Sequence, residues 1–147
     1  KTELVRIQKI ASLHKKQANV AFRINPDFEL KGAAMKMSGG PKQFGIDAEV
    51  FTETFSMVNE QSINFVGFHI FSGSQNLSVD ALLESYRKAL ELAFVLSEQI
   101  NVLPKQINIG GGIGVSYHSG QVPVDIKSLC LGLHELLDEL ATKLVDT

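Results

Sequence analysis

Three consecutive glycines, Gly110, Gly111 and Gly112, are the residues whose type and spacing point most directly to chemistry. They follow the short apolar segment 106–109, which is typical of a buried strand. Glycine has no side chain, so the backbone N–H groups of such a turn can approach an anion closely, and a following helix adds the positive end of its dipole. The pattern predicts a phosphate-binding turn, although a tightly bent connection without any ligand produces the same pattern.

A second polar turn follows the preceding apolar run of the sequence. Ser72, Gly73, Ser74 and Gln75 come at the end of the segment 65–71. A serine hydroxyl can donate a hydrogen bond to an anionic oxygen, although serine is also common in turns that bind nothing. In a barrel of alternating strands and helices, ligand-binding groups collect at the carboxyl ends of the strands. We therefore expect the two turns to lie on the same edge of a sheet.

Composition and charge indicate one globular domain. The chain has 147 residues, of which 44% are hydrophobic, and a formal net charge of -2. Its basic residues form no cluster, so the charge pattern does not favour binding to nucleic acid or to a membrane surface. We see no secretory segment and no apolar run close to the roughly 20 residues of a membrane span, so we expect a cytoplasmic protein. No metal site is predicted.

The single cysteine, Cys130, cannot form an internal disulfide, which fits a reducing compartment. It lies between Leu129 and Leu131 in an apolar helical pattern. Free cysteine is among the most buried residue types, so we expect Cys130 to be a small buried hydrophobic residue.

The hydrophobic pattern predicts helices that alternate with strands. Helices are expected over residues 3–16, from Asp47 as the N-cap to about Asn59, from Ser78 or Asp80 to just before Pro104, and from Asp125 as the N-cap to residue 144. Strands are expected over residues 19–24, 65–71 and 106–109, and a long loop over residues 28–45. The last helix is expected to bury Leu129, Leu133, Leu136, Leu137, Leu140 and Leu144.

Alternation of this kind predicts an α/β fold with parallel strands joined by right-handed crossovers. A complete (β/α)8 barrel takes about 250 residues, and three strands are too few to close one. The pattern alone fits either a section of such a barrel or a small doubly wound sheet.

Four motifs occur in a characteristic order: FRINPD at residues 22–27, QFGI at 43–46, GFHIFSGSQ at 67–75 and NIGGG at 108–112. Together they closely resemble the barrel domain of the pyridoxal-phosphate-dependent decarboxylases of the ornithine and diaminopimelate group. Segment 35–45 and the Ser-Gln-Asn turn are most similar to the branch associated with exosortase and exopolysaccharide loci. The resemblance implies a section of an alanine-racemase-like (β/α)8 TIM barrel, with residues 1–147 forming one partial barrel domain.

The resemblance also implies which residues bind the cofactor, pyridoxal 5′-phosphate. Gly110, Gly111 and Gly112 match the turn that holds its phosphate, with the Gly112 amide as the direct donor, and Ser74 matches a serine beside the phosphate. Phe71 stands where the family usually has a histidine stacked on the cofactor ring. A phenyl ring can stack on a pyridinium ring but cannot share a proton with it.

Two further residues are expected near the cofactor. His69 projects to the same side of its strand as Phe71, and it is either a core histidine or a residue that supports the cofactor site. Arg23 matches an arginine inside the family's barrel, where a buried charge requires an anionic partner. Gln43 replaces a lysine that many members have before Phe-Gly, which puts any dimer salt bridge from that position in doubt.

The resemblance implies that the parent protein is a carboxy-lyase that removes the α-carboxylate of a basic amino acid or a related substrate. It also implies a homodimer with a C-terminal β domain. The family's Schiff-base lysine belongs upstream of Lys1, and its Glu-Pro-Gly-Arg motif and catalytic cysteine belong beyond Thr147. No catalytic residue is therefore expected in this chain, and the isolated chain is expected to be inactive.

Two alternatives remain at this point. One is a non-catalytic homologue that acts as a binding or regulatory protein. The other is an unrelated phosphate-binding barrel of the racemase type. The sequence does not identify the amino acid that the parent protein would act on.

Overall fold

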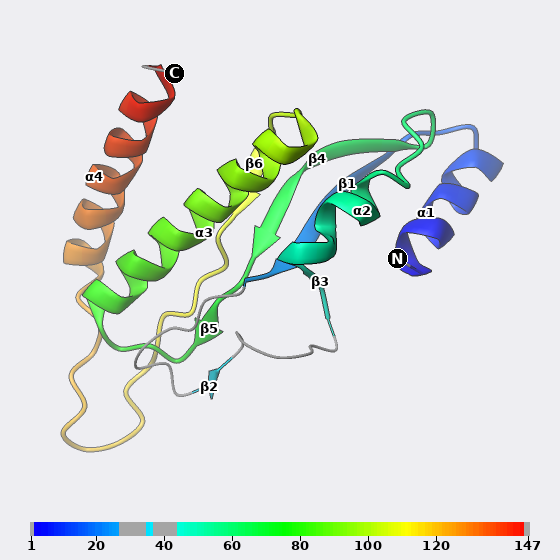
Figure 1. Cartoon of the computed structure of the whole chain (residues 1–147). Coiled ribbons are helices and arrows are strands. Elements are labelled where there is room, and N and C mark those ends of the chain that lie inside the picture. The colour runs from blue at the N-terminus through cyan, green and yellow to red at the C-terminus, as the bar shows by residue number, and fades with distance from the viewer. Residues whose placement is uncertain (1, 27–34, 37–43, 146–147) are drawn as a thin grey trace.

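A parallel sheet with helices packed against one face forms the fold (Figure 1). The computed structural model describes residues 2–26, 35–36 and 44–145. The sheet has the strand order β3-β1-β4-β6, with β1 at Ala18–Asn25, β3 at Ile46–Asp47, β4 at Ile63–Ile70 and β6 at Gln106–Asn108. All of its pairings are parallel. A separate antiparallel pair joins β2 (Met35–Lys36) to β5 (Gly73–Ser74).

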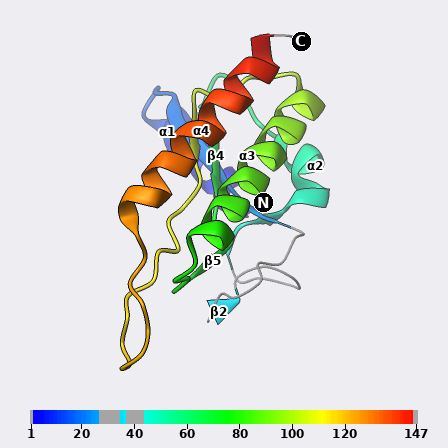
Figure 2. The same cartoon turned by 90° about the vertical axis from the view of Figure 1, so that its left-hand side faces the viewer.

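The helices follow the strands in the expected alternation. They are α1 (Thr2–Leu13), the 3-10 turn η1 (Ala48–Val50), α2 (Phe51–Phe55), α3 (Val79–Ile100) and α4 (Ile126–Val145). Figure 2 shows α3 and α4 side by side, and a cluster of buried leucines joins them. In both views the β2–β5 pair and the loop from β6 to α4 lie at the same end of the molecule (Figure 1, Figure 2).

Alternation along β1 and β4 places one set of side chains under the helices. Phe22 and Ile24 of β1 and Phe68 and Ile70 of β4 are buried in a single core with residues of α1, α2 and α3. Phe51 of α2 lies at its centre, with its ring centroid 5.6 Å from that of Phe22 and 5.3 Å from that of Phe68. Such edge-on ring pairs add to the free energy gained by burying the rings themselves.

The opposite face of the sheet carries polar side chains. The strand register aligns Arg23 of β1 with His69 of β4, and His69 with Asn108 of β6. In the part of the chain that the structure describes, the helices that form the core with β1 and β4 pack against the other face. In a closed barrel, the face without helices is the interior.

A glycine makes the close pairing of β4 and β6 possible. The register of β1 and β4 shifts between Val20 and Ala21, which are paired with Phe65 and Gly67. Gly67 has a φ of +149°, and a Cβ built on it would lie 1.7 Å from the Gln106 carbonyl oxygen. A side chain at this position would therefore separate β6 from the sheet.

The second predicted helix is the largest departure from the expected elements. The α-helix ends at Phe55 instead of about Asn59, and η1 precedes it. Asp47 makes no side-chain capping bond. Asp47 instead belongs to β3, which pairs with the end of β1. The Asp47 carboxylate accepts a hydrogen bond from Asn25 Nδ2 at 3.0 Å. Strand pairing has here taken the place of the cap.

The other helix starts agree with the sequence. The Ser78 hydroxyl accepts a hydrogen bond from the Ala81 amide at the start of α3. The Asp125 carboxylate accepts bonds from the amides of Lys127 and Ser128 at the start of α4. Of the predicted loop 28–45, only residues 35–36 and 44–45 are described, and Gln43 lies outside the described residues.

Two predictions about α4 are wrong. Cys130 is exposed, and Leu137 is 47% exposed. The buried side of α4 is formed by Leu129, Leu136 and Leu140, which pack against α3. Successive helical residues are rotated by about 100°, so a residue directly after Leu129 or Leu136 points away from that side.

Candidate functional site

The two polar turns lie together at the carboxyl edge of the sheet, as expected. The backbone amide of Asn76 donates to the Gly112 carbonyl at 2.9 Å, and the Gly114 amide donates to the Asn76 carbonyl at 2.8 Å. A Cβ built on Gly112 would lie 2.6 Å from the carbonyl oxygen of Gly73. Only glycine at residue 112 permits the turns to come this close.

The glycine turn has a backbone conformation that side chains disfavour. Gly110 has a φ of +75° and Gly112 a φ of +81°. At Gly111 an added Cβ would have no heavy atom within 4 Å, so this side of the turn is open. Among the described residues, the amides of Gly111 and Gly112 have no hydrogen-bond acceptor. Adjacent N–H groups in such a conformation form a concave site for an anion.

Three buried polar atoms in or next to these turns also lack partners within the described residues. They are Ser72 Oγ, Asn76 Nδ2 and Ser116 Oγ. Buried polar groups in folded proteins are nearly always hydrogen-bonded, so three unpaired atoms at one edge mark a polar region whose hydrogen bonds are incomplete. A phosphate, which is rich in acceptor oxygens, would accept hydrogen bonds from the open amides of Gly111 and Gly112. The residues present at this edge therefore fit the phosphate of pyridoxal phosphate.

Ser74 belongs to the same edge and is half-buried. It lies in β5, where it pairs with Met35 of β2. Its position next to Gly73, whose carbonyl faces Gly112, brings Ser74 and the glycine turn to one site. Its predicted bond to the phosphate stays a prediction.

Phe71 lies against the glycine turn. A Cβ built on Gly110 would lie 2.7 Å from Phe71 Cδ2, so the absence of a side chain at residue 110 makes room for the ring. The guanidinium carbon of Arg23 is 5.9 Å from the ring centroid of Phe71 and also 5.9 Å from that of Phe44. Cation–π attraction to both rings therefore holds the Arg23 charge beside Phe71.

The anionic partner expected for Arg23 is not found among the described residues, where the two phenyl rings are its charge-stabilising neighbours. Arg23 is half-buried, which leaves part of the guanidinium hydrated. Partial hydration and two ring faces together lower the cost of a charge on this side of the sheet.

His69 is half-buried next to Arg23 and lies on the polar face, so it is not part of the hydrophobic core. The pKa of His69 is lowered from 6.5, mainly because burial disfavours the charged imidazole and then because Arg23 is positive. Neutral His69 can donate one hydrogen bond and accept another. Of the two alternatives for His69, its position on the polar face excludes a place in the hydrophobic core, and its support of the cofactor site stays a prediction.

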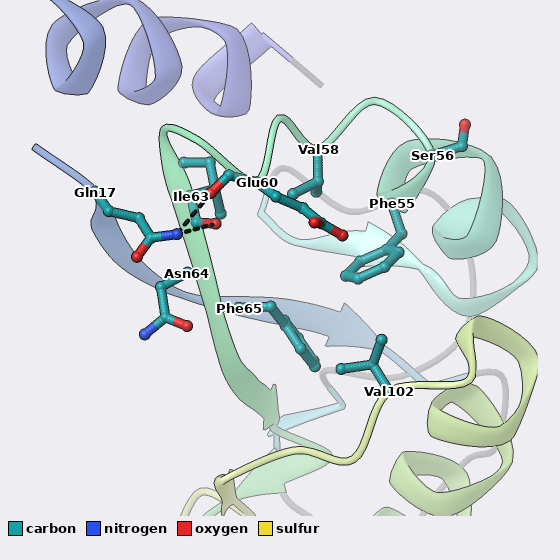
Figure 3. A pocket seen from close by; sticks show the side chains of 9 residues that line it. All are labelled: Gln17, Phe55, Ser56, Val58, Glu60, Ile63, Asn64, Phe65 and Val102. Atoms are coloured by element: carbon teal, nitrogen blue, oxygen red, sulfur yellow. Dashed lines mark hydrogen bonds between the residues drawn. The ribbon is translucent and has the colours of Figure 1, made fainter. Parts of the chain in front are cut away.

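The pocket at the opposite edge of the sheet is a different kind of concavity. It has a volume of about 450 Å³ and lies at the amino-terminal ends of β1 and β4 (Figure 3). Phe55, Phe65 and Val102 form apolar walls, and Gln17 Nε2 is bonded to the backbone carbonyl of Glu60 at 2.6 Å. None of the predicted cofactor residues lines it.

Sequence reasoning missed three residues that hold the turns. Tyr86 recurs at helical spacing with the apolar residues Leu82 and Leu90, a pattern that predicts only a buried helix face, yet its hydroxyl donates to the Gly111 carbonyl at 2.7 Å. Gln75 and Asn76 were recognised as turn residues without a role, yet the Gln75 side chain bonds to Val115 and the Asn76 backbone bonds to Gly112 and Gly114. A tyrosine in place of phenylalanine on a buried helix face was the one available signal.

Within the described residues there is no cluster of three or more acidic, histidine or cysteine side chains that would hold a metal ion. Of the helices described, none is long and apolar enough to cross a membrane.

Comparison with known families identifies the chain as a member of the pyridoxal-dependent decarboxylases. Residues 2–146 match the family model of the pyridoxal binding domain. The family is thus the one that the four motifs indicated, and its cofactor is pyridoxal phosphate. An unrelated racemase-type barrel is excluded.

Individual relatives agree with this membership. The chain is 35% identical over 138 residues to the L-glutamyl-[BtrI acyl-carrier protein] decarboxylase of Niallia circulans, a match that covers 93% of this chain and 32% of the relative. It is 34% identical over 128 residues to the diaminopimelate decarboxylase of Methanocaldococcus jannaschii, covering 83% of this chain and 29% of the relative. The chain spans about a third of the length of these curated relatives.

Solved structures confirm the barrel. The diaminopimelate decarboxylase of M. jannaschii in co-complex with L-lysine superposes with a TM-score of 0.79 at 28% identity, over 97% of this chain and 33% of that one. The Helicobacter pylori diaminopimelate decarboxylase (I148L mutant) complexed with L-lysine gives a TM-score of 0.75 at 25% identity, over 92% and 34%. The chain is therefore a section of the decarboxylase barrel and not a doubly wound sheet.

Proposed function

We propose that residues 1–147 form one partial barrel domain of a decarboxylase and that the carboxyl edge of its sheet binds the phosphate of pyridoxal phosphate. The observation that carries the proposal is the junction of the two turns, where Gly112 can approach Gly73 only because it lacks a side chain. Unpaired backbone amides and buried hydroxyls collect at this junction. Family membership supports the choice of ligand.

In this proposal each residue of the edge has a separate task. The Gly112 amide and the Ser74 hydroxyl donate hydrogen bonds to phosphate oxygens, and Gly110 and Gly111 give the turn its shape. Phe71 covers one face of the cofactor ring. Arg23, held beside Phe71 by cation–π attraction, keeps a positive charge on this side of the sheet.

Bound pyridoxal phosphate supplies a ring that takes up the electrons left when a carboxylate departs as CO₂. This chain contributes orientation. Neutral His69 adds no second positive charge beside Arg23, because burial and Arg23 itself lower its pKa. Phe71 cannot exchange a proton with the ring, so proton transfers depend on groups outside this chain.

We propose that the substrate of the parent protein is a basic amino acid or a related amino-acid compound that loses its α-carboxylate. The relatives include a glutamyl-[acyl-carrier protein] decarboxylase and diaminopimelate decarboxylases, and this supports an amino-acid substrate. The proposal includes a cytoplasmic homodimer, membership of the exosortase-associated branch with its link to exopolysaccharide synthesis, and an isolated chain that is inactive.

The test is a titration of the full-length protein with pyridoxal phosphate, followed by absorbance, together with Gly112→Ala and Gly120→Ala variants. Both glycines have positive φ, +81° and +93°, but only a Cβ at residue 112 would meet another backbone. We expect Gly112→Ala to lower the affinity by more than about tenfold and Gly120→Ala to leave it unchanged. Equal affinities in all three proteins would contradict the proposed site.

Release of CO₂ from a panel of amino acids distinguishes the enzyme from a non-catalytic homologue. The substitution of phenylalanine for the family's usual histidine at residue 71 is the feature that favours the second candidate. Tight cofactor binding without CO₂ from any amino acid would favour the homologue that acts by binding or regulation. CO₂ release that depends on the cofactor would establish the enzyme.

A further inference from the structure

The glycine turn is held in place by a tyrosine on the helix beneath it. Tyr86 of α3 is 5% exposed, and its hydroxyl donates to the Gly111 carbonyl at 2.7 Å. Burial raises the pKa of the Tyr86 phenol, so the hydroxyl keeps the proton that it donates. Little of the Tyr86 surface is open to water that could compete for this bond.

The direction of one carbonyl fixes the direction of the next amide. The Gly111 carbonyl and the Gly112 N–H belong to the same peptide unit, and no cis peptide is found in the described chain. In a planar trans peptide these two groups point in opposite directions. Since Tyr86 holds the Gly111 carbonyl toward α3, the Gly112 N–H points away from α3.

A glutamine holds the other end of the same turn. Gln75 Oε1 accepts a hydrogen bond from the Val115 amide at 3.1 Å, and Gln75 Nε2 donates to the Val115 carbonyl. One side-chain amide thus satisfies both backbone groups of a single residue. The next residue, Asn76, bonds through its own backbone to Gly112 and Gly114.

Gln75 adopts a backbone conformation that is unusual for its type. Its φ is +59°, in the left-handed region that favours glycine. Residues other than glycine persist there when surrounding contacts impose the conformation, and such residues concentrate at functional sites. The two bonds to Val115 are contacts of this kind.

We propose that Tyr86 and Gln75 are positioning residues that aim the Gly112 amide at the anionic group of the ligand. Tyr86 fixes the turn from the helix side, and Gln75 fixes it from the neighbouring turn. This proposal rests on the proposed function above, because the ligand it invokes is the phosphate of pyridoxal phosphate. Neither side chain touches the phosphate; both act through Gly112.

The experiment compares two ligands that differ only in the phosphate, pyridoxal 5′-phosphate and pyridoxal. Dissociation constants are measured by absorbance titration of the full-length protein and of Tyr86→Phe and Gln75→Met. Each substitution keeps the size of the side chain and removes its hydrogen bonds. Each variant should bind pyridoxal phosphate about three- to tenfold more weakly, because the one hydrogen bond that the Gly112 amide donates to the phosphate is weakened, with pyridoxal affinity unchanged.

Matched controls come from the loop between β6 and α4. Tyr117 is 73% exposed, and Gln121 Oε1 accepts bonds from the amides of Tyr117 and His118 at its tip. Tyr117→Phe and Gln121→Met should leave both affinities unchanged. Hydrogen exchange of the unliganded proteins is the second readout, and faster exchange at Gly114 and Val115 is expected in Gln75→Met but not in Gln121→Met.

The outcomes separate the two proposals. A wild-type protein that binds both ligands equally shows that no phosphate is held, and the proposed function fails along with this inference. If the wild-type protein prefers pyridoxal phosphate and both variants keep that preference in full, the positioning roles of Tyr86 and Gln75 are overturned. The proposed phosphate site then stands. Equal loss of affinity for pyridoxal phosphate and pyridoxal also overturns these roles, because a merely structural defect weakens the binding of both ligands.

Discussion

The two edges of the sheet differ in what they leave unpaired. The amino-terminal edge has a pocket of about 450 Å³ in which Gln17 donates to two backbone carbonyls (Figure 3). Asn64, which also lines this pocket, donates from Nδ2 to Asn19 Oδ1 at 2.7 Å. The carboxyl edge has glycines with positive φ and buried donors without partners. A concave shape therefore says less about ligand binding than unsatisfied polar groups do.

The difference follows from the direction of the strands. In a parallel sheet all strands end at the same edge, so the turns that follow them converge there. At the carboxyl edge this convergence brings residues 73–76 against residues 110–115. At the amino-terminal edge Phe55, Phe65 and Val102 gather instead, and they stabilise the fold.

Phe65→Ala should have the largest effect on stability and none on the cofactor. The Phe65 ring lies 5.3 Å from the rings of both Phe55 and Phe68. It is half-buried, so we expect its removal to lower the free energy of unfolding by about 2–3 kcal/mol. Denaturant unfolding measures this change, and cofactor titration should give the wild-type affinity. If Phe65→Ala lowered the affinity for pyridoxal phosphate and left the free energy of unfolding unchanged, the roles proposed for the two edges would be reversed.

Gly110→Ala should affect the carboxyl edge by displacing Phe71. The φ of +75° and a Cβ only 2.7 Å from Phe71 Cδ2 together cost about 1–2 kcal/mol. We expect weaker binding of both pyridoxal phosphate and pyridoxal, because the ring contact is lost. Titration with the two ligands checks this. Loss of binding to pyridoxal phosphate alone would mean that Phe71 does not contact the ring.

Ser74→Ala should have a smaller effect, confined to the phosphate. Loss of one hydroxyl donor is expected to weaken the binding of pyridoxal phosphate by about 1 kcal/mol and to leave the binding of pyridoxal unchanged. Ser119→Ala, at an exposed position in the loop between β6 and α4, is the matched control. An unchanged affinity in both variants would remove Ser74 from the site.

His69 should give the smallest effect, a change in stability with pH. Its pKa is lowered from 6.5 in the folded state by burial and then by Arg23, so the unfolded chain takes up a proton where the folded chain does not. The contribution of neutral His69 to the free energy of unfolding is complete above about pH 6.5. It is lost as the pH falls below that value toward the lowered pKa of the folded state. Thermal unfolding of His69→Gln should show a weaker pH dependence than wild type. His118→Gln, in an exposed loop, should match wild type.

Sequence patterns predicted the elements where a periodic apolar face and a local cap acted together. In α3, Ser78 caps the start, Leu82, Tyr86 and Leu90 are buried, and the helix ends before Pro104. The prediction failed at Asp47, where pairing with Asn25 of β1 replaced the helix cap. It also failed at Cys130, because neighbouring leucines do not reveal which side of a helix meets its partner.

The sequence by itself determined that two glycine- and serine-containing turns follow successive strands, because glycine conformations and strand alternation are local properties. Only the tertiary structure decided which side chains hold those turns. The Tyr86–Gly111 bond joins residues 25 apart in sequence, and the Gln75–Val115 bonds join residues 40 apart. Contacts at such separations leave no periodic trace in the sequence, since they depend on how α3 and the neighbouring turn pack around the glycines.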